Sequence, residues 1–161
     1  MKNFIKSNIE LFGAAALILA DQLSKLFFDG KTIVVLQNVF SFKSVHNTGA
    51  AFSFLRNHTV LLIIISLIFL TAFLLFHKAQ KKKTKLYRFA FAFGFAGAIG
   101  NLIDRIFLGY VRDFLSADFI NFPIFNVADI CLNVGVALFA IWIIKCEIKQ
   151  NDKTKIMKNN K

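Results

Sequence analysis

The chain has 161 residues, the length of about one domain. Hydrophobic residues make up 57% of it, Phe alone occupies 21 positions and the formal charge is +11, with a mean hydropathy of +0.60. A soluble domain has about 45–50% apolar residues, and a chain of this length buries only about 70% of its surface on folding. The composition therefore excludes an ordinary water-soluble monomer and favours a membrane protein.

The basic residues and cysteines exclude two further classes. The basic residues occur in blocks between apolar runs, without the interleaved aromatic and polar side chains of a nucleic-acid-binding face, so we expect no nucleic-acid partner. Cys131 and Cys146 lie 15 positions apart in one apolar segment, about 22 Å if helical. A disulfide joins Cα atoms at most about 7 Å apart, so these two thiols should not pair.

Four apolar stretches are long enough to cross a hydrocarbon core of about 30 Å, which takes about 20 helical residues. They are residues 9–28, 59–76, 89–108 and 125–144. The first stretch also has features of a cleaved signal peptide, because Lys2 and Lys6 precede its apolar core. Its apolar pattern continues past Ala20 to Phe28, however, with polar residues on one helical face. We therefore predict four transmembrane helices.

The positions of lysine and arginine predict the orientation, because basic loops stay on the cytoplasmic side of a membrane. Fourteen of the twenty basic residues lie before the first stretch, between the second and third, or after the fourth. We therefore expect both termini in the cytoplasm, with residues 29–58 and 109–124 outside.

The outer loop 29–58 carries a strand pattern. Residues 32–36 are rich in β-formers, and residues 39–45 alternate apolar and polar side chains, as in a strand with one buried face. The Lys- and Asn-rich residues 151–161 lack periodicity and are predicted to be a disordered cytoplasmic tail. The predicted fold is an all-α membrane protein with one domain over residues 1–150, a four-transmembrane-helix bundle with a small extracytoplasmic β-sheet cradle.

Three of the predicted helices carry polar side chains where polarity is expensive, since an ionisable group at the centre of a spanning helix costs about 2.5–3.5 kcal/mol. The first has Asp21 and Lys25, the third has Asn101, Asp104 and Arg105, and the fourth has Asn126, Asp129 and Asn133. Their spacing places the sets of the first and fourth helices each on one helical face. The topology puts all of them within about 6–12 Å of the outer boundary. We expect them to meet inside the bundle.

Some of these side chains also have a purely structural interpretation. Asp21 and Lys25 have the i,i+4 spacing of an ion pair within one helix. Asn101 and its polar neighbours can brace the outer end of the third helix, where Asp104 can be neutralised by Arg105 or Lys25. Asn47 and Gly49, which lie in the outer loop, fit the residues of a turn.

Asp113 and Asp129 are harder to explain structurally. Each lies at a membrane boundary among Phe and Ile, and Arg112, in an extended stretch, would point away from Asp113. Two carboxyl groups that meet without a counter-ion cannot both ionise cheaply, so one keeps a proton at neutral pH. One carboxylate can then accept a proton from water while its protonated partner donates to a carbonyl oxygen, which is the chemistry of amide hydrolysis.

Two other functions compete with this interpretation. Intramembrane acids also hold protons in transporters, but such proteins commonly show inverted repeats and polar groups at the midplane, and this sequence shows neither. Ser24 beside Lys25 would fit a serine/lysine peptidase. Adjacent helical positions differ by about 100°, however, so these two side chains should not face each other.

Five blocks of sequence resemble a known family, the prolipoprotein signal peptidases of bacteria, also called type II signal peptidases. The blocks are Asp21-Gln22-Leu23-Ser24-Lys25, Asn47-Thr48-Gly49-Ala50-Ala51-Phe52, Gly100-Asn101-Leu102-Ile103-Asp104-Arg105, Gly109-Tyr110-Val111-Arg112-Asp113-Phe114 and Phe125-Asn126-Val127-Ala128-Asp129. They occur in the family's order on the predicted elements, and the resemblance covers about residues 5–145.

The resemblance implies an aspartyl endopeptidase of the bacterial inner membrane, active near the outer leaflet. It would remove the signal peptide from diacylglyceryl-modified prolipoproteins just before the lipobox cysteine. Asp113 and Asp129 are implied as the catalytic pair. The implied supporting or substrate-binding residues are Asp21, Lys25, Asn47, Gly49, Asn101, Asp104, Arg105, Asn126 and Ala128.

The resemblance implies no metal and no organic cofactor. The expected partners are the lipid-modified prolipoprotein and membrane lipids, and we expect a monomer. Arg112 departs from the family pattern, in which a small aliphatic residue is usual at this position, and this departure bears on the local pKa balance.

Overall fold

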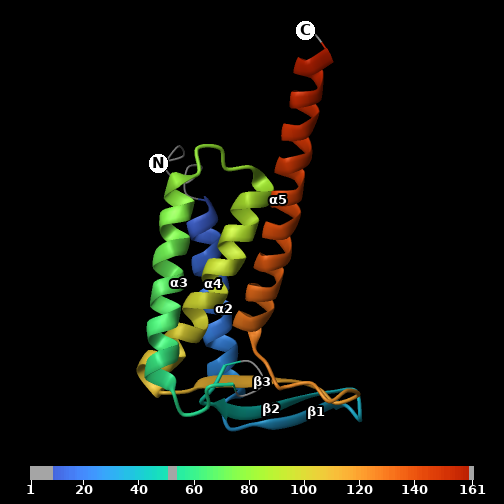
Figure 1. Ribbon diagram of the computed structural model, residues 1–161. Helices are drawn as coiled ribbons and strands as arrows, with labels where there is room; N and C mark the ends of the chain where they lie inside the picture. The colour runs from blue at the N-terminus through green and yellow to red at the C-terminus, as the bar shows by residue number, and fades with distance from the viewer. Residues whose placement is uncertain (1–8, 51–53, 160–161) are drawn as a thin grey trace.

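The computed structural model describes residues 9–50 and 54–159. The helices lie side by side, and a small sheet lies across one end of them (Figure 1). In chain order the elements are α2 (Ile9–Phe28), β1 (Thr32–Leu36), β2 (Phe40–Asn47), α3 (Thr59–Ala79), α4 (Lys85–Leu108), β3 (Val111–Ala117) and α5 (Val127–Asn159).

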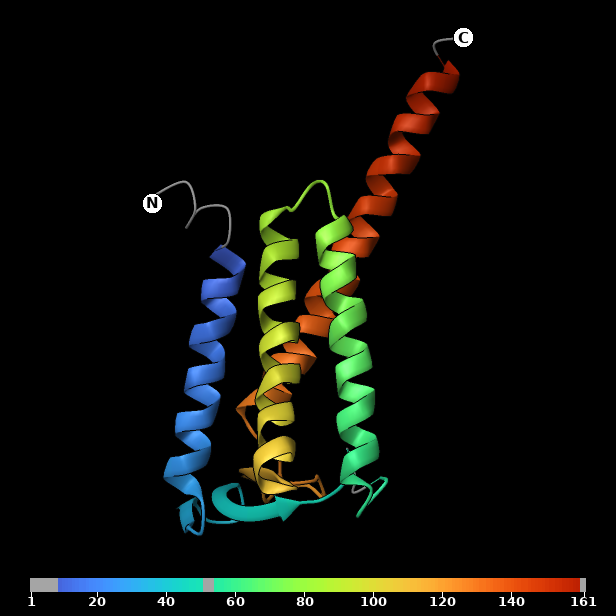
Figure 2. The same cartoon turned by 90° about the vertical axis from the view of Figure 1, so that its left-hand side faces the viewer.

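The predicted helical bundle with a small sheet is confirmed. In the described residues, α2, α3, α4 and the first 24 residues of α5 are long and apolar enough to cross a membrane. The predicted bounds of α2 match those of the structure, and α3 and α4 extend a few residues beyond theirs. The two views in Figures 1 and 2 place the connection between α3 and α4 at the end of the bundle opposite the sheet.

Helix α4 is the centre of the bundle and packs against α2, α3 and α5. Its small side chains allow this close packing, because Ala92 and Ala96 form a cluster with Ala14 of α2. At Gly100, a Cβ atom would lie 2.6 Å from the Asp21 carboxylate. A glycine here therefore lets a carboxylate approach the backbone of α4.

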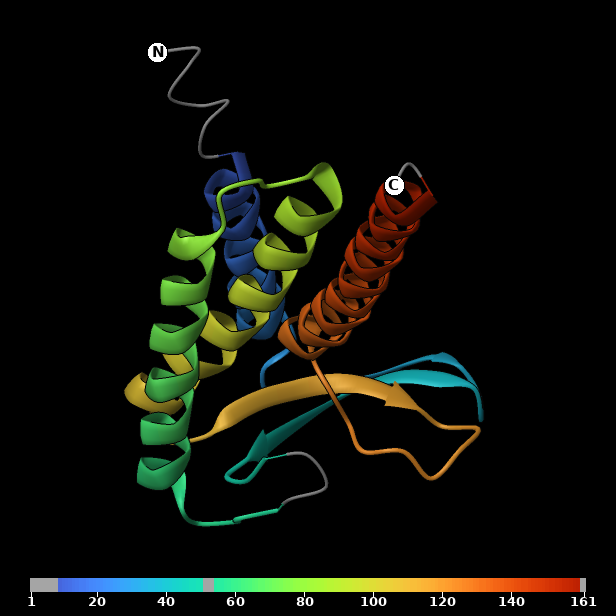
Figure 3. The ribbon, with the colours of Figure 1, turned by 45° about the horizontal axis from the view of Figure 1, so that its top comes forward.

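The sheet is antiparallel with the order β1-β2-β3. The sequence pattern predicts β1 and β2 but assigns no strand to residues 111–117. These residues form β3 because they pair with β2, more than 60 positions earlier in the chain. Phe28 at the end of α2 stacks on Phe42 and on Phe114, with ring centroids 4.0 and 4.9 Å away. These rings join the sheet to the bundle. Figure 3 shows the strands lying across the end of the helices.

Helix α5 continues past its membrane-spanning part to Asn159 and extends beyond the other helices (Figure 1). The disordered tail was predicted for residues 151–161, of which 160 and 161 lie outside the described residues. Lengthening an existing helix needs no new nucleus, and Lys, which is frequent here, is a good helix former. The absence of apolar periodicity therefore did not predict the backbone conformation of this segment.

A buried polar cluster joins the helices at the end opposite the sheet. The side chain of Glu10 is 1% exposed, and its carboxylate lies 2.6 Å from Arg88 and 3.5 Å from His77. His77 also contacts the hydroxyl of Tyr87, at 3.2 Å. These contacts connect α2, α3 and α4.

Candidate active site

The start of α5 fixes the position of Asp129. The Asp129 carboxylate accepts a hydrogen bond from the backbone N–H of Asn126 at 3.1 Å, and the Asn126 side chain accepts one from the N–H of Asp129 at 2.9 Å. This reciprocal pair is a capping box. The backbone N–H of Ala128, also in the first turn of α5, donates to the carboxylate of Asp21 in α2 at 2.8 Å. The first turn of α5 is therefore held on both sides.

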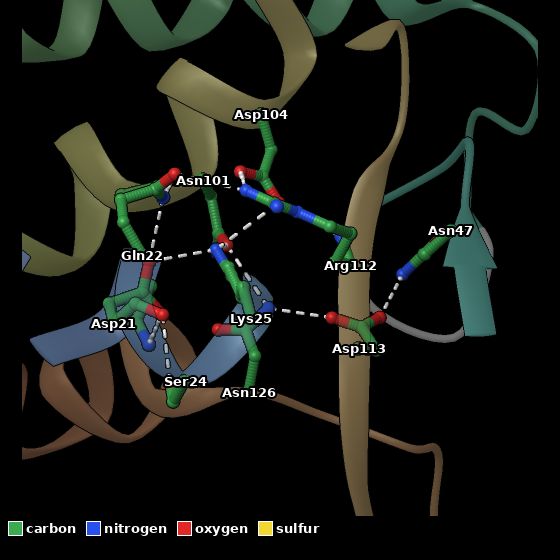
Figure 4. Close-up of polar contacts among 12 residues, drawn as sticks. Asp21, Gln22, Ser24, Lys25, Asn47, Asn101, Asp104, Arg112, Asp113 and Asn126 are labelled. Atoms are coloured by element: carbon green, nitrogen blue, oxygen red, sulfur yellow. Dashed lines mark hydrogen bonds and ion pairs between the residues drawn. The ribbon is translucent and has the colours of Figure 1, made fainter. Parts of the chain in front are cut away.

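Asp113 is presented by β3 and accepts a hydrogen bond at each carboxyl oxygen (Figure 4). Asn47, at the end of β2, donates to Oδ2 at 2.9 Å, and Asn126 donates to Oδ1 at 2.6 Å. The N–H of Gly49 donates to the side-chain oxygen of Asn47 at 2.9 Å. That contact turns the amide nitrogen of Asn47 toward Asp113.

Two asparagines connect the carboxyl groups of Asp113 and Asp129. Asn126 Nδ2, which donates to Asp113, also donates to Asn101 Oδ1 at 3.1 Å. Asn101 Nδ2 in turn donates to Asp129 Oδ1 at 2.8 Å. Both aspartates line one cavity of about 740 Å³, together with Asn47, Asn101 and Arg105. The structure thus brings the two predicted acids to the same cavity.

Burial favours the protonated form of Asp113. Its side chain is buried, and this burial together with the negative charge of Asp129 raises the pKa of Asp113 to about 6. The hydrogen bonds from Asn47 and Asn126 act in the opposite direction and are outweighed. Asp129 is less deeply buried. This is the asymmetry expected of a pair in which one member retains a proton.

A buried ion cluster lies behind the asparagines. Lys25 is fully buried, and its ammonium group lies 2.9 Å from Asp21 and 3.6 Å from Asp104. The predicted Asp21–Lys25 ion pair is confirmed. Lys25 also donates to Asn101 Oδ1 at 3.0 Å. Because that oxygen faces a cation, the amide nitrogen of Asn101 must face the other way, toward Asp129.

Of the two partners expected for Asp104, Lys25 is confirmed at 3.6 Å, and Arg112 takes the place expected of Arg105. Arg112 binds both oxygens of Asp104, at 2.7 and 3.2 Å, and its backbone N–H adds a third hydrogen bond at 3.0 Å. Arg105, by contrast, donates to the carbonyl oxygen of Gly49. As predicted, the side chain of Arg112 does not point along that of Asp113. The Asp104 carboxylate therefore neutralises the positive charge of Arg112.

Gln22 belongs to this cluster, although the sequence interpretation gave it no role. Its side-chain oxygen accepts from Arg112 at 3.0 Å, and its amide nitrogen donates to the carbonyl oxygen of Gly100 at 3.1 Å. Its position between Asp21 and Lys25 in a predicted spanning helix could have indicated this role from the sequence. Ser24, also in this stretch, donates to the carbonyl oxygen of Asp21. Ser24 binds the backbone carbonyl of Asp21 and Lys25 binds its carboxylate, so the two side chains do not bind each other and the geometry gives no support to a serine/lysine pair.

Residues 13–145 match the family model described as signal peptidase (SPase) II. A lipoprotein signal peptidase of Dehalococcoides mccartyi is 44% identical over 139 residues, covering 81% of this chain and 83% of that protein. One from Clostridium acetobutylicum is 35% identical and covers 90% and 99%. The chain belongs to the signal peptidase II family. It is thus a peptidase by family.

Solved structures agree with the fold of this signal peptidase II. A bacterial membrane enzyme determined by the in meso method at 2.3 Å resolution superposes with a TM-score of 0.79 and 31% sequence identity, covering 85% of this chain and 88% of that one. A second bacterial membrane enzyme, at 1.9 Å resolution, gives a TM-score of 0.76 at the same identity and covers 85% and 93%.

Proposed function

We propose that this signal peptidase II removes the signal peptide from diacylglyceryl-modified bacterial prolipoproteins, cutting just before the lipidated cysteine, with Asp113 and Asp129 as the catalytic pair. One observation supports this proposal above the others. The two carboxyl groups line the same cavity and are linked through Asn126 and Asn101. Of the nearby cations, Lys25 and Arg112 are bound to other acids, and Arg105 donates to a backbone carbonyl oxygen. This arrangement lets the pair share one proton.

The proposed reaction needs only these two acids and water. Asp113 carries the proton in the free enzyme, and ionised Asp129 accepts a proton from a water molecule whose oxygen attacks the scissile carbonyl carbon. Asp113 donates its proton to the carbonyl oxygen, which gives a neutral gem-diol. The proton on Asp129 then passes to the amide nitrogen and Asp113 takes back a diol proton, so the C–N bond breaks and both acids return to their starting states.

The position of the cavity fits a lipid-modified substrate. With both termini in the cytoplasm, the sheet lies at the outer end of the bundle, and the signal helix of a precursor brings its scissile bond there. Apolar side chains of three helices line the cavity below the acids, among them Ile65, Phe69 and Leu132. They offer the diacylglyceryl chains an apolar surface. Arg105 at the cavity wall offers a cation for polar substrate groups.

Cleavage of a defined substrate tests the proposed function. Purified protein in a lipid bilayer should cleave a peptide that carries a signal helix, a lipobox and a diacylglyceryl-modified cysteine. Mass spectrometry should identify a product whose first residue is the modified cysteine. The same peptide with an unmodified cysteine is the control, and we expect at least about tenfold slower cleavage. Equal rates for both peptides would contradict the assigned substrate class.

The rate should fall at alkaline pH. The free enzyme needs one protonated and one ionised carboxyl group, and Asp113, with a pKa of about 6, loses its proton as the pH rises. We expect kcat/KM to decrease about tenfold per pH unit above the second apparent pKa of the pair, near 6. The alkaline limb of kcat should lie at higher pH, because bound substrate displaces water around the acids. A kcat/KM that is constant from pH 5 to 9 would refute the shared proton.

A further inference from the structure

Two polar side chains line the cavity from two different helices. Ser66 of α3 lies seven residues after Thr59, and Asn133 of α5 lies six residues after Val127. At 1.5 Å per residue, both lie about 10 Å along their helices from the end that meets the sheet. Asn133 lies about 6 Å along α5, one helical turn, from Asp129, on the side away from the sheet.

Asn133 has unused hydrogen-bonding capacity at this depth. Its Nδ2 donates to the carbonyl oxygen of Asp129 at 3.0 Å. In residues 9–50 and 54–159, Asn133 Oδ1 accepts no hydrogen bond, and the side chain is exposed in a segment long and apolar enough to span a membrane. Ser66 donates to the carbonyl oxygen of Leu62 at 2.8 Å. An amide oxygen left without a donor is costly in hydrocarbon, so a ligand that supplies an N–H would stabilise this site.

The proposed substrate supplies such a group at this depth. A peptide bond must leave the helix before water can attack its carbonyl carbon, because a helical carbonyl is hydrogen-bonded and shielded. The residues just before the scissile bond then lose their helical hydrogen bonds. An extended chain rises about 3.3 Å per residue, so the 6 Å between Asp129 and Asn133 corresponds to about two residues.

We propose that Asn133 binds the main chain of the signal peptide, accepting a hydrogen bond from the backbone N–H about two residues before the scissile bond, in the cavity that Ser66 of α3 also lines. This inference rests on the proposed function, because the direction and depth of the bound segment follow from it. The ligand class is an extended peptide backbone in an apolar groove. Recognition of the backbone would be independent of the side chains of the signal peptide.

Replacing Asn133 with Leu tests the proposed contact, since Leu has a similar volume and no hydrogen-bonding group. We expect KM for the lipidated peptide to rise about 5- to 30-fold, the factor contributed by one buried hydrogen bond. We expect kcat to change less than twofold and the pH profile to keep its shape, because the acids are untouched. Thr71→Val is the control, because Thr71, like Asn133, donates to the carbonyl oxygen four residues earlier in its own helix but does not line the cavity.

A change in the substrate tests the same hydrogen bond without altering the protein. In peptides that carry an ester in place of one amide, at the first, second or third position before the cysteine, the donor N–H is absent. One of these esters should raise KM in the wild-type protein about as much as Asn133→Leu does, and it should have no further effect in that variant. Ester effects of equal size in both proteins would overturn the proposal, as would an unchanged KM in folded Asn133→Leu protein.

Binding measurements separate this proposal from the cleavage mechanism. Asp113→Asn protein should hold the peptide uncleaved, so that fluorescence titration compares the amide and ester peptides without turnover. The amide should bind about 5- to 30-fold more tightly, and Asn133→Leu in the same background should remove the difference. A wild-type protein that cleaves no lipidated peptide refutes the proposed function. Normal cleavage with equal binding of amide and ester refutes only the Asn133 contact.

Discussion

Replacing Asp113 or Asp129 with Asn is expected to lower kcat by at least about 10³-fold in folded protein. Asn has nearly the same shape as Asp but can neither take a proton from water nor give one to a carbonyl oxygen. Each general acid or base contributes about 10²- to 10⁴-fold to a rate, and the two acids act on the same proton transfers. The double variant should therefore be little slower than either single variant. Initial rates with the lipidated lipobox peptide measure these effects.

Asp118→Asn provides a matched control for this prediction. Asp118 directly follows β3, the strand that carries Asp113, but its carboxylate binds Lys43, Ser41 and Ser116 on the sheet and does not line the cavity. The ammonium group of Lys43 and the two hydroxyl groups lower the pKa of Asp118 to about 2. We expect this variant to retain cleavage within about threefold of wild type, because general acid–base chemistry does not involve it. Near-normal turnover in folded Asp113→Asn or Asp129→Asn protein would refute the catalytic assignment.

Replacing Lys25 with Met should destabilise the protein by about 3–5 kcal/mol, the typical cost of breaking a buried ion pair. The side chains of Lys25, Asp21 and Asp104 are at most 1% exposed. Without the ammonium group, Asp21 loses its cation while still bound to the start of α5. The amide of Asn101 is also free to rotate, so Asp129 loses a fixed donor. Thermal unfolding in detergent and the cleavage rate report the two effects.

Two further variants test this explanation. The double variant Lys25→Met, Asp21→Asn removes one cation and one anion. It should recover a substantial part of the lost stability, because the remaining buried carboxylate, that of Asp104, still has Arg112 as its partner. Lys43→Met removes a lysine that is 42% exposed and paired with Asp118, and it should cost less than about 1 kcal/mol. If Lys25→Met were no more costly than Lys43→Met, the buried cluster would not hold the site together.

The sequence alone was sufficient to predict the helices and the polar set. Hydropathy depends on composition over about 20 residues, so the positions of the four apolar segments follow from the chain without knowledge of packing. Helical spacing likewise placed Asp21 and Lys25 on one face, and the structure confirms their ion pair. The cost of polar groups in hydrocarbon marked the residues that must meet inside the bundle.

Only the tertiary structure decided which of these groups are partners. Asp104 binds Arg112 of β3 rather than Arg105 beside it, and Asn126 lies between Asp113 and Asn101. The pairing of β3 with β2 decides the first contact, and the packing of α5 on α4 decides the second. Hydropathy and periodicity describe one segment at a time, whereas hydrogen-bond partners depend on how distant segments dock. The sequence therefore identifies the polar residues, but the tertiary structure determines which of them bind each other.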